Sequence, residues 1–184
     1  MLWLFLLGVL GFFQEVQAGV FNVPHLISPG SFAVGIEPQF FMTPRASWGG
    51  DLRYVQGISE ISNATVILGG ASSGVRWGAN TTFDIIPDLP EQIGFGFALE
   101  LLRVRPHTWI MWVPYLHKTF SQGLEPFIAF PLGWSLRDGR YESLSSLVLG
   151  TYFEHCVHFK TVFELGMGLQ GMSTYLSGGV LYYQ

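Results

Sequence analysis

The densest group of chemically reactive residues is a short tract near the C-terminus that contains Glu154, His155, Cys156 and His158. A cysteine beside a histidine is the arrangement of a nucleophile with its base, and histidine-rich tracts bind metal ions. A structural zinc site needs four ligands, and the spacing of this tract fits no zinc pattern. A polar hairpin turn explains the tract better. We therefore expect no enzymatic activity, no metal and no cofactor.

A second set of reactive residues is charged and occupies alternate positions in otherwise apolar segments. Its members are Glu37, Arg53, Arg76, Asp84, Glu100, Lys160 and Glu164. An unpaired buried charge is very costly, so these groups must pair if their side of the chain is enclosed. Two interpretations stay open, a network that only holds the shape of the protein and a gated or selective pathway. Arg76→Met should leave ion flux unchanged in the first and raise it strongly in the second.

The composition limits the kinds of protein that can carry these groups. The chain has 184 residues, of which 49% are hydrophobic, 16% aromatic and 12% charged, whereas soluble domains carry about 25% charged residues. Its richness in aromatic residues excludes a disordered chain. A net charge of −4 with 9 Lys and Arg residues leaves no basic surface for a nucleic acid. The single Cys156 excludes an intrachain disulfide framework.

The N-terminus has the pattern of an export signal. Residues 2–13 form an apolar run, and the small residues Val16 and Ala18 follow it at the spacing of a cleavage site. The run is too short for a transmembrane helix, which needs about 20 residues. We therefore predict a signal peptide at residues 1–18, a periplasmic or lumenal segment at residues 19–30 and the folded domain at residues 31–184.

The folded domain shows apolar residues at every second position. Residues 75–85, 93–101 and 157–169 alternate over nine or more residues, which indicates strands rather than helices. Seven less regular segments bounded by turn residues complete the set. They are residues 31–42, 52–59, 64–70, 108–116, 127–136, 141–153 and 175–183.

Two kinds of barrel can hold these strands, and they differ in which face points outward. The polar faces are rich in Gly and Ala, which suit a crowded lumen but weaken a strand that faces water. The apolar faces carry long side chains, with aromatic residues near the strand ends where a membrane barrel has its girdles. The predicted girdle is Trp77, Trp109, Tyr115, Trp134, Tyr182 and Tyr183. We predict an all-β, antiparallel transmembrane up-and-down barrel of about ten strands, with eight as the other count. A secreted soluble barrel that binds a small hydrophobic ligand is the alternative.

These features resemble the small outer-membrane β-barrels of Gram-negative bacteria. The resemblance covers the whole chain after residue 18 and rests on the signal segment, the even strand count, the short hairpins and the aromatic last strand. It implies a location in the bacterial outer membrane and contact with membrane lipids. The chain is also similar to porin-like proteins of predatory bacteria, whose barrels form rings that enclose lipid.

Bulky residues on both faces of residues 108–116 and 141–153 require one set to point inward, which narrows the lumen. Pro38, Pro114 and Pro131 lie inside predicted strands, where each removes a ladder hydrogen bond, and a second protomer could shield such positions. We therefore expect a non-enzymatic structural or porin-like barrel with a plugged lumen that forms a homo-oligomer, with a ring as one form and no identified small-molecule substrate. The predicted subunit interface is Trp109, Trp112, Ser143, Ser145, Leu147 and Phe153.

Overall fold

The computed structural model describes residues 26–42, 46–71, 74–120 and 123–184. The predicted signal peptide, residues 1–18, lies outside the described residues, as do residues 19–25. Regular structure in the described part is entirely β, and helical membrane spans are absent from it. The strands are β1 (Phe32–Phe41), β2 (Ser47–Ser59), β3 (Ser62–Ala71), β4 (Gly74–Ile86), β5 (Gly94–Val104), β6 (His107–His117), β7 (Leu124–Ala129), β8 (Leu132–Arg137), β9 (Arg140–Cys156), β10 (Phe159–Gln170) and β11 (Tyr175–Tyr183).

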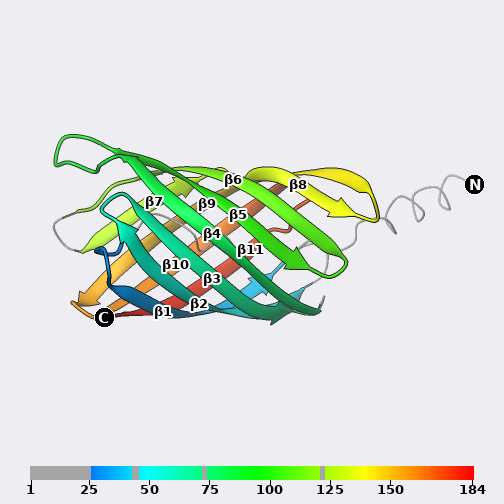
Figure 1. The fold of residues 1–184 in the computed structure, drawn as a ribbon, viewed down its shortest axis with the longest axis horizontal. Helices are drawn as coiled ribbons and strands as arrows, with labels where there is room; N and C mark the ends of the chain where they lie inside the picture. Colours follow the sequence, from blue (N-terminus) through cyan, green and yellow to red (C-terminus); the bar gives the residue numbers. More distant parts are fainter. Residues whose placement is uncertain (1–25, 43–45, 72–73, 121–122) are drawn as a thin grey trace, which may run out of the picture.

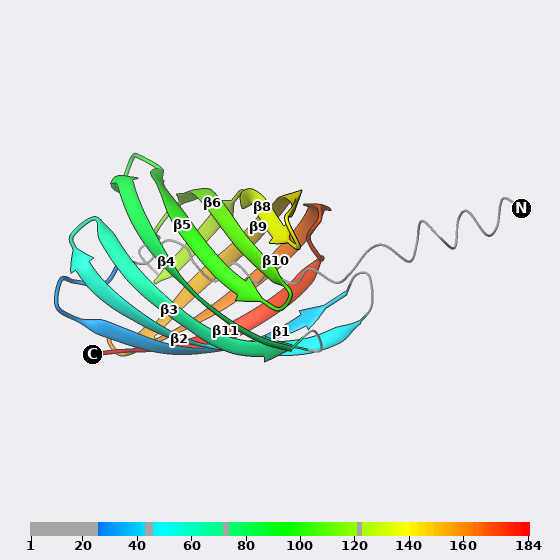
Figure 2. The same ribbon diagram turned by 45° about the vertical axis from the view of Figure 1, so that its right-hand side comes forward.

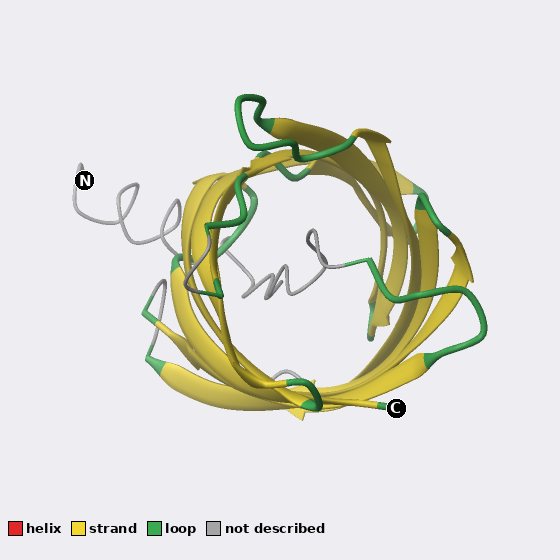
Figure 3. Ribbon diagram, turned by 90° about the vertical axis from the view of Figure 1, so that its left-hand side faces the viewer, coloured by secondary structure: helices red, strands yellow, loops and turns green. Residues whose placement is uncertain are grey.

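The strands form one antiparallel sheet that closes into a barrel (Figures 1 and 3). Sequence neighbours pair from β1 to β6, β10 pairs with both β9 and β11, and β11 returns to β1 (Figure 2). Strands β7 and β8 both lie between β6 and β9, so the described residues fill ten positions around the barrel. The predicted fold class is confirmed. Because the number of positions is even, both ends of the described chain lie at the same end of the barrel. We call this end the terminal end and the opposite end of the barrel the far end.

The strand predicted at residues 127–136 is interrupted, and that prediction of one continuous strand is wrong. The break falls at Phe130 and Pro131, between β7 and β8. Proline has no N–H to donate to a ladder, and Pro114 of β6 lies beside the same break. The Phe130 N–H donates to the Pro114 carbonyl at 2.9 Å, and the Ser146 N–H donates to the Pro131 carbonyl at 3.1 Å. These two bonds hold the broken strand between β6 and β9.

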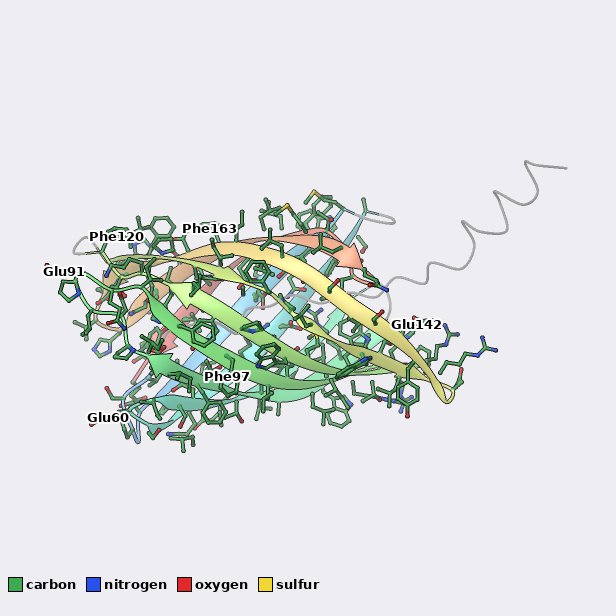
Figure 4. All side chains as sticks on the ribbon, turned by 90° about the horizontal axis from the view of Figure 1, so that it is seen from above. Glu60, Glu91, Phe97, Phe120, Glu142 and Phe163 are labelled. Atoms are coloured by element: carbon green, nitrogen blue, oxygen red, sulfur yellow. The ribbon has the colours of Figure 1, made fainter. Side chains whose placement is uncertain are left out.

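Alternate side chains point out of the barrel and into it. Along β4, Val75 and Trp77 are exposed whereas Arg76 is 2% exposed. Large exposed apolar side chains occur on every strand from β1 to β11, and Figure 4 labels Phe97 and Phe163 on the wall between the two ends. Along residues 31–42, 75–85 and 93–101 the apolar residues point outward and the polar or small residues point inward, as predicted. The barrel is therefore apolar on the outside.

The inward side chains divide the lumen into two unlike walls. The wall formed mainly by β5 to β9 is apolar, and the wall formed mainly by β1, β2 and β4 carries charged groups. The apolar wall holds the largest buried cluster, to which Leu102, Val104, Trp109, Met111, Val113, Tyr115, Phe127, Leu144, Val148 and Tyr152 belong. The hydrophobic core of this barrel is thus inside its lumen.

Residues 26–31 fold back against β2 and β3 at the terminal end. The Gly30 N–H donates to the Gly57 carbonyl at 3.1 Å, and the Ile27 N–H donates to Asn63 Oδ1 at 3.1 Å. Gly57 is buried, and a Cβ added there would touch the carbonyl oxygens of Ile27 and Ser28. This part of the N-terminal segment therefore lies on the lumenal side of β2.

The loop between β4 and β5 is tied to the end of β6 by a group of polar contacts. Lys118 Nζ lies 2.8 Å from Asp88 Oδ1 and donates to the carbonyls of Leu89 and Gln92. The Thr119 N–H donates to Asp88 Oδ2 at 2.5 Å. Asp88 is thus the carboxylate that joins the two loops of the terminal end.

This contact predicts that the loop loosens in acid. Partial burial acts to raise the pKa of Asp88, but hydrogen bonds from Lys118 and Thr119 outweigh burial and lower that pKa below its ordinary value of 3.8. The carboxylate therefore stabilises the loop fully above pH 3.8, and the stabilisation is lost as the pH falls through the lowered pKa. Amide hydrogen exchange should show the protection of Thr119 disappearing over that range. Asp88→Asn should have weak protection at every pH, and protection that survives acid in the wild type would contradict the assignment.

Candidate functional site

The charged wall of the lumen is the candidate functional site, and its centre is a pair of buried arginines. Arg53 on β2 is 1% exposed and Arg76 on β4 is 2% exposed. Arg53 donates from Nε to Glu37 Oε2 at 2.9 Å, and its Nη2 lies 2.8 Å from the same oxygen. The Nη2 atom also lies 3.7 Å from Asp51 Oδ2. Arg53 therefore binds the carboxylate of the neighbouring strand β1 and approaches a second one on its own strand.

Arg76 binds the carboxylate of Asp51 in a bidentate contact. Its Nε lies 2.5 Å from Asp51 Oδ1, and its Nη2 lies 2.5 Å from Asp51 Oδ2. The same Nη2 donates to Gln39 Oε1 at 2.5 Å, and Gln39 Nε2 donates to Asp51 Oδ2 at 3.2 Å. Bidentate arginine–carboxylate pairs are the strong and directional ones. Strands β1, β2 and β4 are therefore joined through the lumen by side chains as well as by their ladders.

The space for the Asp51 carboxylate depends on a missing side chain at Gly69 of β3. A Cβ added at Gly69 would overlap Asp51 Oδ1 and the Gly50 carbonyl. Gly69→Ala should therefore displace the carboxylate that holds Arg76 and lower the free energy of unfolding by about 1–3 kcal/mol, measured by denaturant unfolding in micelles. Gly70→Ala is the control, because its Cβ would approach its nearest neighbour, the Gly74 carbonyl, only to 3.6 Å. Equal stability of the two variants would contradict this role of Gly69.

Two further predicted carboxyl groups face the same centre. Glu100 is 3% exposed and Glu164 is 1% exposed, and the charge of Arg53 acts on both of them as well as on Glu37 and Asp51. Glu164 Oε2 accepts a hydrogen bond from the Tyr175 hydroxyl at 3.3 Å. Within the described residues, neither oxygen of Glu100 has a hydrogen-bond partner. The centre of the lumen is thus acidic on balance.

The remaining two predicted members, Asp84 and Lys160, belong to separate groups near the terminal end. Asp84 Oδ1 lies 3.4 Å from His117 Nε2, and His117 Nδ1 lies 3.1 Å from Glu125 Oε1. Lys160 Nζ lies 3.1 Å from Glu154 Oε2 and 5.5 Å from the ring centre of Tyr183. Among the described residues, Asp84 thus contacts His117 and Lys160 contacts Glu154, whereas Glu37 contacts Arg53 at the centre of the lumen.

The predicted aromatic girdle needs three corrections. Trp77, Trp134 and Tyr182 are exposed on the outer surface at 57%, 58% and 41%. Trp109 and Tyr115 are 0% and 1% exposed because they point into the lumen, so their assignment to the girdle is wrong.

Tyr183, the third correction, is half-buried and packs against the apolar cluster of the lumen. Trp48 and Tyr141, 71% and 73% exposed, lie near the far end and were not included in the prediction. Trp48 was missed because strand β2 begins five residues before the predicted segment 52–59.

The predicted subunit interface changes at one position. Trp109 faces the lumen and cannot contact a second protomer, so its inclusion is wrong. The other members lie on the outer surface of β6 and β9, where Trp112 is 46% exposed and Phe153 is 36% exposed. Ser143, Ser145 and Leu147 share that outward phase of β9.

The tract with Cys156 lies at the hairpin between β9 and β10, where the sequence placed a turn. His155 Nε2 lies 2.8 Å from Thr161 Oγ1, and His158 Nδ1 lies 3.0 Å from the Tyr183 carbonyl. Both imidazoles thus bond to groups other than the thiol of Cys156, which is exposed. Among the described residues, acidic, histidine and cysteine side chains nowhere gather in a group of three that could hold a metal ion.

Sequence reasoning left several buried polar residues out of the predicted charge network, among them Gln39, Asp51, His117 and Glu125. Asp51 and Glu125 lie one and two residues before the predicted starts of their strands, so their faces were never assigned. The signal for Asp51 was present in the sequence, because Asp51 and Arg53 share the two-residue period of one face. Earlier strand starts would have placed both carboxylates on the lumenal face of their strands.

No family model and no curated protein matches the sequence. Among solved structures, the chain is similar to an outer membrane channel from Pseudomonas putida F1, with a TM-score of 0.51 and 10% sequence identity over 92% of this chain and 100% of that chain. It is also similar to a structure from the de novo design of transmembrane β-barrels, with a TM-score of 0.47 and 12% identity over 87% and 100% of the two chains. At 10% identity the likeness to the channel is one of fold alone. It agrees with the closed, all-β, antiparallel up-and-down barrel that the strand pairing defines.

Proposed function

We propose that this chain is a non-enzymatic, structural or porin-like barrel of a bacterial outer membrane, with a lumen plugged at mid-height. The observation that carries the proposal is the outer surface, which presents large apolar side chains on every described strand. The largest apolar patch of a typical soluble monomer covers about 300–600 Å², whereas here the apolar surface encircles the barrel. A lipid bilayer is the solvent that such a surface fits.

The lumen supports a plug better than an open pore. Buried arginines and carboxylates fill one wall, and Trp109, Met111 and Tyr115 fill the other. Barrels of about eight strands have interiors that side chains fill, while wide aqueous channels need about sixteen strands. Ten positions lie near the filled end of this range.

The alternative, a secreted soluble barrel for a small hydrophobic ligand, fits the side-chain orientation poorly. Such a barrel turns its apolar face inward around the ligand. In this chain Ile36, Leu68 and Val75 point outward at 65%, 54% and 73% exposure, whereas Arg53 points inward. The likeness in fold to an outer membrane channel also supports the membrane barrel.

Fractionation of cells, together with gel migration before and after heating in detergent, tests the membrane barrel. We expect the protein in the outer membrane fraction, with a shift in migration on heating, and a soluble periplasmic product would overturn the proposal. Planar bilayer recording tests the plug. The wild type and Arg76→Met should both show little conductance if the network is structural, and a large rise in the variant would indicate a gate.

Homo-oligomerisation is the second part of the proposal. The outer surface of β6 and β9 adjoins the break at Phe130 and Pro131, where proline removes a ladder donor, and lost backbone hydrogen bonds are costly in lipid. A second protomer that covers this surface would shield the break. Ser145→Cys in a Cys156→Ser background should give disulfide-linked dimers in mild detergent, whereas the same change at Leu68, on the outside of β3, should not. If mass measurement and cross-linking detect only monomers, homo-oligomerisation is wrong. A ring like that of the porin-like proteins of predatory bacteria is a separate prediction about the form of the oligomer.

A further inference from the structure

The middle of the lumen holds more acid than base. In the described part of the chain, four buried carboxyl groups share this region with two guanidinium groups. They are Glu37, Asp51, Glu100 and Glu164 against Arg53 and Arg76. Arg76 holds Asp51 and Arg53 holds Glu37 in direct contacts. Glu100 and Glu164 therefore have no guanidinium of their own, and the lumen must neutralise them by other means.

The surroundings of Glu100 show where a neutralising partner for its carboxylate is expected. Glu100 on β5 faces Asn80 on β4 across the ladder, and both are almost completely buried, with exposures of 3% and 4%. No described residue forms a hydrogen bond with Glu100 Oε1 or Oε2, or with Asn80 Oδ1 or Nδ2. Buried polar atoms in folded proteins almost always have a partner. Two adjacent buried side chains without a hydrogen-bond partner indicate that a small polar species binds beside them in the lumen.

We propose that Glu100 and Asn80 bind a monovalent alkali cation together with its water, at the middle of the lumen. Carboxylate and amide oxygens are the ligands that hard cations prefer, and one positive charge matches the one carboxylate of Glu100. A chelated transition metal fits less well, because the described His, Cys, Asp and Glu side chains form no group of three that could hold a metal ion. The proposal rests on the plugged membrane barrel proposed above and adds the ion class that its lumen accepts.

Thermal unfolding of the full chain in zwitterionic micelles tests the site without requiring ion flow. The ionic strength is held constant while sodium or potassium chloride replaces the chloride of N-methylglucamine, a large organic cation. At a cation concentration ten times its Kd, the unfolding equilibrium constant should fall roughly tenfold, which raises the midpoint by about 3–6 °C for a chain of this size. Equal midpoints in the small-cation and large-cation salts would overturn the proposal.

Variants locate the effect at the proposed residues. Glu100→Gln should lose the dependence on sodium and potassium, and in N-methylglucamine chloride it should unfold at a higher temperature than the wild type because an unneutralised charge is gone. Asn80→Asp should strengthen the dependence, which keeps the test decisive if Glu100→Gln fails to fold. Glu142→Gln, at the exposed far end (Figure 4), should behave like the wild type. A shift that persists in Glu100→Gln would place the cation elsewhere and contradict the site.

Failure of this inference is distinguishable from failure of the proposed function. If Glu100 is neutralised by a proton, the barrel still enters lipid vesicles and shifts on heated gels, but its midpoint does not depend on the cation. If the membrane barrel itself is wrong, vesicle insertion and heat-dependent migration are lost.

Discussion

Arg76→Met is expected to lower the free energy of unfolding by about 3–5 kcal/mol, the usual cost of removing one partner from a buried ion pair. Arg76 and Asp51 are each almost fully buried, and three side-chain contacts within 2.5 Å converge on the guanidinium. Methionine fills a similar volume but leaves the Asp51 carboxylate without its main cation. Equilibrium unfolding in guanidinium chloride, in vesicles or micelles, measures the change.

Two further variants show whether the loss comes from the unpaired charge. Arg140→Met removes an exposed arginine at the far end and should change stability by less than about 0.5 kcal/mol. The double variant Asp51→Asn with Arg76→Met should recover part of the loss, because it leaves no charge unpaired at Asp51. A single variant as stable as the wild type would show that the pair does not hold the barrel together.

Leu99→Arg is expected to lower the free energy of unfolding by about 2–4 kcal/mol in a lipid bilayer, the cost of an arginine at the bilayer midplane of a barrel. Leu99 lies at the centre of β5, and its side chain is 51% exposed and points outward. In water the same change at a half-exposed surface position would be close to neutral. The measurement is reversible unfolding from lipid vesicles.

Depth in the membrane supplies the control for this substitution. Leu169, 69% exposed, is the penultimate residue of β10 at the far end, where an arginine should cost about 0–1 kcal/mol. If Leu99→Arg and Leu169→Arg have equal small effects, the outer surface of the barrel does not face lipid.

The barrel could be predicted from the sequence because a strand of a closed sheet repeats every two residues and one of its faces is apolar. Along residues 75–85 the period is unbroken, and β4 has the predicted bounds to within one residue at each end. The pairing of Arg76 with Asp51 could not be predicted. It depends on how neighbouring strands are staggered, and no local pattern encodes that stagger.

Strand β6 shows where the sequence pattern was ambiguous. Both of its faces are apolar, so the alternation alone could not tell whether Trp109 and Tyr115 or Trp112 pointed into the lumen. The signal lay at the ends of the strand, because His107 and His117 share the phase of Trp109 and are buried. Polar residues at both ends of one face of a strand mark that face as the lumenal one. This criterion is stronger than the presence of aromatic residues near the strand ends.

The central claim, that the apolar face of this barrel contacts lipid, is tested most directly by spin labels on the wall. Single cysteines at Phe97, Leu99 and Leu101, in a Cys156→Ser background and in lipid vesicles, would carry nitroxides on the outward face of β5, with Glu91 in the exposed loop as the control. We predict that the three wall labels collide often with oxygen, which concentrates in lipid, and rarely with a water-soluble nickel chelate, while the label at Glu91 does the reverse. Wall labels that collide mainly with the nickel chelate would show that this face meets water and would contradict the account.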